Sequence, residues 1–416
     1  MIRTDKICEK LIWLLTLIFV VSLYLFAAED WGRYLYFGTA MCIFVLTVIR
    51  FKGVIGFSAG RFHLFLLLFA VYSLFSVLWA WDSAAAISKF QMIMSILVCY
   101  SLIYPYYSNR YAVDELLNVI MWAGYVVAVY SIYYYGFDTI RDASSAANMR
   151  LENSYNNINS ISMICAFACV IQVYKLVFHK FSFSSLFLIP CIAVITAMQS
   201  KKAIFVLVDG FLFVFILKNL KNRDLVQKII RVIVVIAIFV GVAVVLSRLP
   251  IFNGVNQRIE RLIASFTGQG KVDRSSTIRA QMRLIGMQQF WKTPFCGIGI
   301  GSSHILVSRL MGENTYLHNN YIELLTCGGI IGTALYYIPY FIVGKTFLKK
   351  ANLMERETGI CVILLLQLFI WDFGAVSYST KIHYFYMMLF FIQADYLKES
   401  ERKQKSMKGE ADICIF

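Results

Sequence analysis

Apolar residues in this sequence gather into long runs instead of alternating with polar residues at short intervals. A helix needs about 20 apolar residues to cross a hydrocarbon core of roughly 30 Å, and most of the runs approach that length. The pattern therefore predicts an all-α, polytopic membrane protein with about twelve spanning helices. The predicted spans are residues 8–28, 34–50, 62–80, 86–104, 114–136, 159–178, 183–199, 203–218, 229–247, 320–344, 357–375 and 381–397.

The composition agrees with this pattern. Of the 416 residues, 59% are hydrophobic and 15% charged, and the mean hydropathy is +0.68. A soluble protein of this size cannot hide so much apolar surface. The first apolar run lacks a small-residue cleavage site, so we expect it to remain as a signal anchor. The cysteines and histidines show no ligand spacing for zinc. We expect no metal, no cofactor and no nucleic-acid partner.

The basic residues predict an orientation. They collect before the first span, after the second, before the ninth and eleventh, and in the tail. With twelve spans all five groups fall on one side, which the positive-inside rule assigns to the cytoplasm together with both termini. The chain then divides into nine spans at 1–247, a large outer loop at 248–319, three spans at 320–397 and a basic tail at 398–416.

Three basic features fall on the predicted outer side, against the positive-inside rule. They are Arg141 with Arg150, the pair Lys201 and Lys202, and the loop 248–319, which has nine Lys or Arg and three acids. Positive charge in these places predicts an anionic ligand outside. The alternative is that these side chains reach lipid headgroups.

The outer loop contains a predicted amphipathic helix within "SSTIRAQMRLIGMQQFWKTPFCGIGIG", residues 275–301. Arg279 and Arg283 are four residues apart and share a face, which costs about a few tenths of a kcal/mol unless an anion lies between them. The "GIGIG" segment lacks the spacing of a dinucleotide fingerprint and predicts a flexible turn near a ligand or the membrane. The alternative for the segment is an interfacial helix lying on the bilayer.

An amide-rich stretch, "NMRLENSYNNINS" at 148–160, leads into the sixth span. Helix capping explains one of its asparagines but not all four. Amides beside the guanidinium of Arg150 suit sugar hydroxyls and phosphate oxygens. This stretch is a candidate substrate-binding element.

Polar residues also open the tenth span in "LHNNYIELLTCGGIIG", residues 317–332. Asn320 and Glu323 have the spacing of a capping box. Gly328 and Gly332 are most simply explained by close helix packing. His318 has neither role, and a neutral imidazole there can deprotonate a hydroxyl.

Four stretches in order, "RLENSYNNIN", "MQSKKA", "IRAQMRLIGMQQFWKTPFCGIGIG" and "HNNYIELLTCGGIIG", resemble the bacterial O-antigen polymerase/ligase family of C-type membrane glycosyltransferases. The similarity covers about residues 150–345. The family carries an arginine about fifteen residues before a proline, which falls on Arg279. Its histidine falls on His318 and its acid on Glu323. Its Ser-Arg pair is matched only partly, because Lys201 follows Ser200 and a lysine loses bidentate phosphate binding.

The resemblance implies transfer of a glycan from a polyprenyl diphosphate without a metal or other cofactor. His318 would be the general base and Glu323 would orient it or hold the acceptor. The residues implied in binding the diphosphate are Arg279, Arg150, Lys201 and Arg283. The residues implied in holding sugar or acceptor are Asn157, Asn159 and Asn319. An arginine before an Asn-x-Asn helix start is the family feature that Arg150 matches.

The resemblance also implies a place in the cell and a set of partners. The enzyme would be a multi-pass protein of the bacterial cytoplasmic (inner) membrane with its active site on the outer face. Its partners would be lipid-linked glycan donors and acceptors, membrane lipids, and the chain-length regulator and flippase of the same pathway.

Two functions other than a polymerase are possible alternatives. A ligase would move the finished glycan onto lipid A core. A lipid-linked oligosaccharide flippase or transporter would carry ionisable residues deep in several spans and would have pseudo-symmetric halves. The sequence has few such residues, namely Asp209 and Asp372, and no halves are evident. The abundant aromatic residues, the twelve spans and the final motif favour the polymerase.

Overall fold

The computed structural model describes residues 2–26, 29–54, 60–145, 151, 155–219, 225–267, 274–349 and 357–413. Helices form nearly all of this part of the chain, and no strand occurs in it. The α-helices are α1 (Ile2–Leu25), α2 (Asp30–Arg50), α3 (Arg61–Phe75), α4 (Ser83–Arg110), α5 (Val113–Tyr135), α6 (Phe137–Ser145), α7 (Ile158–Phe178), α8 (Leu188–Met198), α9 (Lys201–Asn219), α10 (Leu225–Ser247), α11 (Asn253–Thr267), α12 (Arg274–Lys292), α13 (Ser303–Met311), α14 (Asn320–Lys349), α15 (Thr358–Asp372) and α16 (Lys381–Ile413).

A helix lies over each of the twelve apolar runs, so the all-α membrane architecture is confirmed. Within the described residues, seven helices are long and apolar enough to cross a membrane, namely α1 to α5, α7 and α14, with η1 (Ser76–Leu78) extending α3. Three further apolar helical stretches are shorter, at Phe183–Met198, Ile229–Val242 and Thr358–Asp372. The count of twelve spans stays a prediction.

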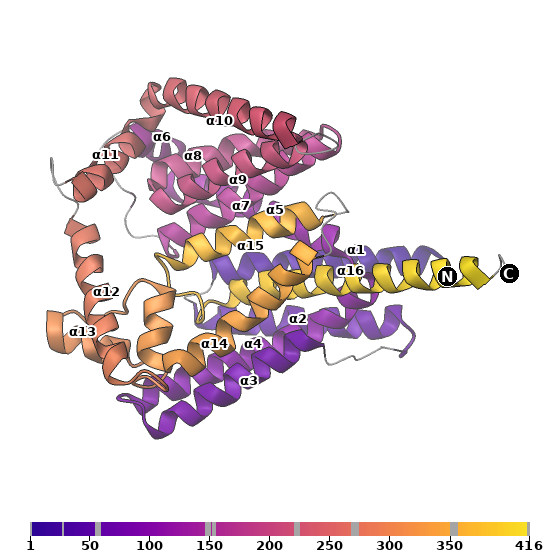
Figure 1. The fold of residues 1–416 in the computed structure, drawn as a ribbon, viewed down its shortest axis with the longest axis horizontal. Helices are drawn as coiled ribbons and strands as arrows, with labels where there is room; N and C mark the ends of the chain where they lie inside the picture. The colour runs from indigo at the N-terminus through magenta and orange to yellow at the C-terminus, as the bar shows by residue number, and fades with distance from the viewer. Residues whose placement is uncertain are drawn as a thin grey trace.

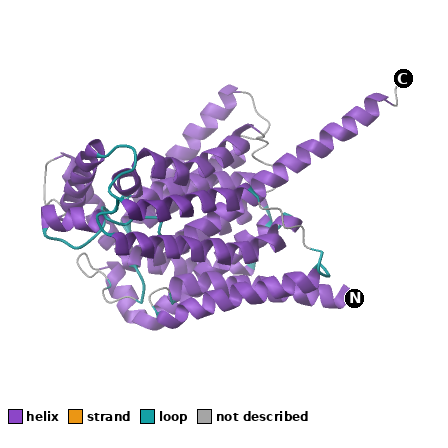
Figure 2. Cartoon of the chain, turned by 90° about the horizontal axis from the view of Figure 1, so that it is seen from below, coloured by secondary structure: helices purple, strands orange, loops and turns teal. Residues whose placement is uncertain are grey.

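The long helices run roughly along the long axis of the molecule (Figure 1). Both termini lie at one end, and α6, α11, α12 and α13 gather at the opposite end (Figure 1); Figure 2 also shows both termini at the same end. The centre of the bundle contains α7, whose side chains from Ile161 to Ile171 are all buried. Such a helix is apolar around its whole circumference because it contacts protein on every side.

The loop 248–319 is largely helical in its described part, and α12 lies where a helix was predicted; its amphipathic character is weak, because Gln289 is buried while Leu284 and Trp291 are exposed. Met282 and Phe290 are buried on its inner face. That face packs on α14 at Gly286, whose carbonyl accepts a 3.0 Å hydrogen bond from Thr326 Oγ1. A side chain at Gly286 would begin 2.6 Å from Ile322 Cγ2. The buried face of α12 therefore packs on α14, while Leu284 and Trp291 of the same helix are exposed.

Helix α14 is interrupted at Gly329, where the backbone has φ 60° and ψ −163°. Beyond this break, Ile330 N donates to the carbonyl of Pro294 (2.8 Å) and Ile331 N donates to that of Phe295 (3.2 Å). The turn after α12 thus supplies the acceptors that an unbroken helix would provide for itself. A Cβ at Gly329 would lie 2.2 Å from Phe295 O, so only glycine fits here.

The "GIGIG" turn packs tightly, so the expectation of a flexible turn is wrong. Gly297, Gly299 and Gly301 all have positive φ. A Cβ at Gly297 would lie 2.5 Å from the backbone of Cys327, and one at Gly299 would lie 2.4 Å from Ala80. The turn is therefore held between α14 and the segment that joins α3 to α4. Close helix packing by the GxxxG pair is confirmed, because a Cβ at Gly332 would lie 2.7 Å from the ring of Tyr72.

Gly329→Ala is expected to destabilise the protein by about 3 kcal/mol, because it combines a backbone conformation unfavourable for L-residues with a steric clash. Thermal unfolding of the full chain in detergent measures the effect. Gly312→Ala is the matched control, since Gly312 also has positive φ (73°) but open space where its Cβ would lie. Equal losses in both variants would contradict the role given to the clash.

Candidate active site

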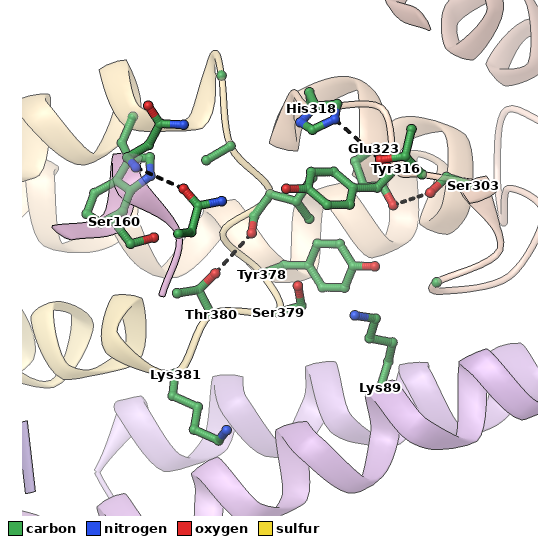
Figure 3. A pocket seen from close by; sticks show the side chains of 18 of the residues that line it. Lys89, Ser160, Ser303, Tyr316, His318, Glu323, Tyr378, Ser379, Thr380 and Lys381 are labelled. Carbon is green, nitrogen blue, oxygen red and sulfur yellow. Dashed lines mark hydrogen bonds between the residues drawn. The ribbon is translucent and has the colours of Figure 1, made fainter. Parts of the chain in front are cut away.

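A cavity of about 700 Å³ lies where segments far apart in the sequence meet. Its walls come from the end of α1, the first turns of α4, α7 and α9, from α12 and α13, and from the segments before α14 and between α15 and α16. Figure 3 shows part of this lining. The cavity lies toward the end of the molecule that carries α12 and α13, away from the termini (Figure 1).

Five of the predicted site residues line this one cavity, namely Arg279, His318, Glu323, Asn157 and Asn159. They come from three of the stretches on which the resemblance was based. The remaining stretch, "MQSKKA", contributes Lys202 from the first turn of α9. The predicted elements therefore meet in space, although up to about 160 residues separate them in the chain.

Four other predicted site residues have different positions. Arg150 lies outside the described residues. Arg283 is exposed one turn along α12 from Arg279 and does not line the cavity. Lys201 does not line it either, because successive helical residues point in different directions and it is Lys202 that faces inward. Asn319 is buried as a helix cap, as described below.

His318 lies in the short segment between α13 and α14, and its backbone has a φ of 55°. Positive φ is uncommon for a residue other than glycine and often occurs at functional sites. Its ring centroid lies 4.3 Å from that of Tyr316, and its Nε2 lies 3.3 Å from Thr315 Oγ1. Burial, and then the charges of Arg279 and Lys202, lower the pKa of His318 from 6.5 to about 4. The imidazole is therefore neutral at pH 7.

Glu323 is 1% exposed and anchors the segment that carries His318 (Figure 3). Its Oε2 accepts a hydrogen bond from the backbone N–H of Leu317 (3.0 Å), the residue before His318. Its Oε1 accepts one from Ser303 Oγ (2.5 Å) at the start of α13. The carboxylate thus joins α13, α14 and the histidine segment.

The predicted capping box of Asn320 and Glu323 is wrong. The residue that caps α14 is Asn319, whose Oδ1 accepts from Ile322 N (3.0 Å) and whose Nδ2 donates to Phe373 O (3.1 Å). The helix begins one residue earlier than the spacing implied, so Glu323 faces Leu317 instead of the cap.

Asn320 has a role that the sequence did not predict. Its Oδ1 accepts from the backbone N–H groups of Ser377 (2.9 Å) and Tyr378 (3.1 Å). Its Nδ2 donates to Tyr337 Oη (2.8 Å) and lies 3.3 Å from a carboxylate oxygen of Asp372. Asn320 therefore fixes the segment between α15 and α16, which forms one side of the cavity.

The asparagines at the start of α7 divide into two roles. Asn157 is the cap of α7, because its Oδ1 accepts from Asn159 N (2.9 Å). Asn159 Oδ1 accepts from Ser200 Oγ (3.1 Å), so the starts of α7 and α9 are joined. Lys202, two residues further, donates to the carbonyl of Gly374. The helix-capping explanation is confirmed for Asn157.

The cavity lining is strongly cationic. Lys89, Lys202, Arg279 and Lys381 line it, and Glu323 is the one carboxylate among the lining residues. Lys89 and Lys381 were not among the residues predicted from the sequence. The available signal was a lysine inside an otherwise apolar run, which is costly unless it has a function. A cationic cavity that contains the neutral imidazole of His318 suits a polyanionic substrate with a hydroxyl that must lose a proton.

Comparison with known proteins gives one family match. Residues 186–337 match the family model described as O-antigen ligase. No curated protein matches the chain. The matched segment includes Lys202, Arg279, His318 and Glu323, while the asparagines of α7 precede it. Over residues 186–337 the chain is thus similar to the O-antigen ligase family, in agreement with the resemblance of its motifs.

Proposed function

We propose that this protein is a polymerase of polyprenyl-diphosphate-linked oligosaccharide repeat units for a cell-surface polysaccharide such as O-antigen, capsule or exopolysaccharide. The observation that carries the proposal is the meeting of Arg279, His318 and Glu323 with two asparagines in one cationic cavity. The O-antigen ligase family match supports glycosyl transfer of this type. The reaction is an inverting transfer in which basic side chains stabilise the diphosphate.

Arg279 and Lys202 are proposed to bind the diphosphate of the donor. Both line the cavity, and both act electrostatically on His318, so the diphosphate would lie close to the base. A guanidinium binds two phosphate oxygens at once, and this contact strengthens as negative charge gathers on the leaving group. Arg150 stays a predicted further ligand.

His318 is proposed to act as the general base. Its neutral ring nitrogen takes the proton of the acceptor sugar hydroxyl while the oxygen attacks the anomeric carbon. The bond from that carbon to the diphosphate oxygen breaks, and the diphosphate leaves with the electron pair. Glu323 positions His318 through Leu317 N, because its oxygens already accept bonds from Leu317 and Ser303. Asn157 and Asn159 would hold sugar hydroxyls.

The site is proposed to face the outer side of the bacterial cytoplasmic membrane. The cavity lies away from the end that carries both termini, and the basic loops of the sequence favour cytoplasmic termini. The lipid tail of the donor would then remain in the outer leaflet while its diphosphate enters the cavity.

A ligase is the alternative function, because the matched family model is described as O-antigen ligase. The lipid products in a deletion strain distinguish the two. For a polymerase, we expect single repeat units on the carrier or on the core. Long chains stranded on the carrier would instead identify a ligase.

Arg279→Ala and His318→Ala are each expected to abolish polymer formation while the protein still inserts into the membrane. Arg279→Lys should be nearly as damaging, because lysine cannot make the bidentate phosphate contact. Arg283→Ala is the matched control, since Arg283 lies on the same helix but is exposed. Gel profiles of the polysaccharide together with membrane protein levels measure both effects. Full-length polymer in either alanine variant would refute the assignment.

The pH profile is expected to report the low pKa of His318. Protonated His318 cannot accept a proton, so kcat/KM should fall only as the pH drops toward about 4, well below 6.5. Lys202→Gln removes a positive charge that opposes protonation, so the acidic limb should move to higher pH. An acidic limb that does not respond to Lys202→Gln would contradict this electrostatic account.

A further inference from the structure

Two basic side chains of the cavity, Lys89 and Lys381, are not part of the proposed donor site. Lys89 extends from α4, and Lys381 is the first residue of α16. Figure 3 shows both lysines on one side of Tyr378, Ser379 and Thr380, with His318 on the other side. The cavity therefore has a second cationic wall.

Both lysines are held in place, yet neither forms an ion pair with a carboxylate among the described residues. Tyr100 Oη donates to the carbonyl of Lys381 (2.9 Å), and the Lys381 ammonium lies 4.9 Å from the ring centroid of Tyr36. The stem of Lys89 packs beside the glycine turn, since a Cβ at Gly301 would lie 3.0 Å from its Cγ. Neither positive charge is thus paired directly with a carboxylate among the described residues.

Each lysine has one charged neighbour that acts on it from a distance. Arg33 of α2 lies close enough to Lys381 to repel it electrostatically. Lys89 interacts electrostatically with the carboxylate of Glu323. The oxygens of this carboxylate accept hydrogen bonds from Ser303 and Leu317 and not from Lys89. Uncompensated cations in a cavity are costly unless an anion binds there.

A charge count indicates the chemical class of that anion. Each lipid-linked diphosphate brings about two negative charges, one from each phosphate. With the Glu323 carboxylate counted, the lining cations still exceed the charge of one diphosphate, so a donor on Arg279 and Lys202 leaves positive charge at Lys89 and Lys381 for a second anion. A repeat-unit polymerase has two lipid-linked diphosphates as substrates, since its acceptor also stays on the carrier.

The second wall also lies next to a membrane-interface feature. Trp31 and Tyr34, at the start of α2, are 50% and 80% exposed. Exposed aromatic residues of this kind mark the boundary between membrane and water. Tyr36 on the same helix contacts Lys381, so a lipid whose diphosphate binds Lys381 would have its tail near α2.

We propose that Lys89 and Lys381 bind the diphosphate of the acceptor lipid, across the cavity from the donor site. This inference rests on the proposed polymerase function. The acceptor glycan would extend past the segment 378–380 toward His318. Lysines act as point charges and accept several phosphate orientations, which suits an acceptor that is exchanged after every cycle.

Native mass spectrometry of the full chain with added polyprenyl diphosphate tests the proposal. We expect two bound equivalents for the unaltered protein. The double variant Lys89→Gln/Lys381→Gln should retain one, with the second bound at least about tenfold more weakly. The double variant Lys292→Gln/Lys345→Gln removes two exposed lysines outside the cavity and should still bind two. Thermal unfolding checks that each variant is folded.

Three outcomes are decisive. Two equivalents on folded Lys89→Gln/Lys381→Gln would overturn the proposal. Displacement of one equivalent by phosphatidylglycerol at equal concentration would also overturn it, because the lysines would then bind a lipid headgroup. Arg279→Ala tests the donor site separately. If it keeps two equivalents while the lysine variant keeps one, the donor assignment fails and the second site stands.

Discussion

The structure depends on the break in α14 at Gly329. Because the backbone leaves helical geometry there, Ile330 and Ile331 donate to the carbonyls of Pro294 and Phe295 instead of to their own helix. Two further hydrogen bonds tie the region before the break to other segments. Ile298 N, in the turn after α12, donates to Thr326 O (3.0 Å), and Tyr72 Oη, on α3, donates to Gly328 O (2.5 Å). Helices α3, α12 and α14 are thereby joined at one point. The cavity residues carried by α12 and α14 keep their relative positions for this reason.

The sequence predicted the helices well, because apolar runs of membrane length leave few alternatives to helix. It also predicted that Arg279, His318 and Glu323 belong together, through the family resemblance. It did not predict the partners of Asn320 or the inward direction of Lys202. Both features depend on the exact residue at which a helix starts, because a shift of one residue turns a side chain by about 100° around the helix axis.

Lys89 and Lys381 escaped prediction for a related reason. Lys89 lies within an apolar run and Lys381 at the start of one, and a lysine that reaches lipid headgroups has the same sequence pattern. Only the packing of α4 against α16, with Tyr100 bonded to the start of α16, directs both toward one cavity. The same limit applied to the glycine turn, where open conformations were expected and close neighbours were found.

The cations proposed to bind the diphosphate also weaken the proposed base. Arg279 and Lys202 disfavour protonation of His318, so in the empty cavity the imidazole takes protons poorly. A bound diphosphate would offset those positive charges and raise the proton affinity of His318 at the moment when a donor is present. Base strength would then follow donor occupancy. Such coupling would suit an enzyme that holds an activated glycan next to water. A base that is weak without the donor and stronger with it accepts a proton mainly when glycosyl transfer can follow.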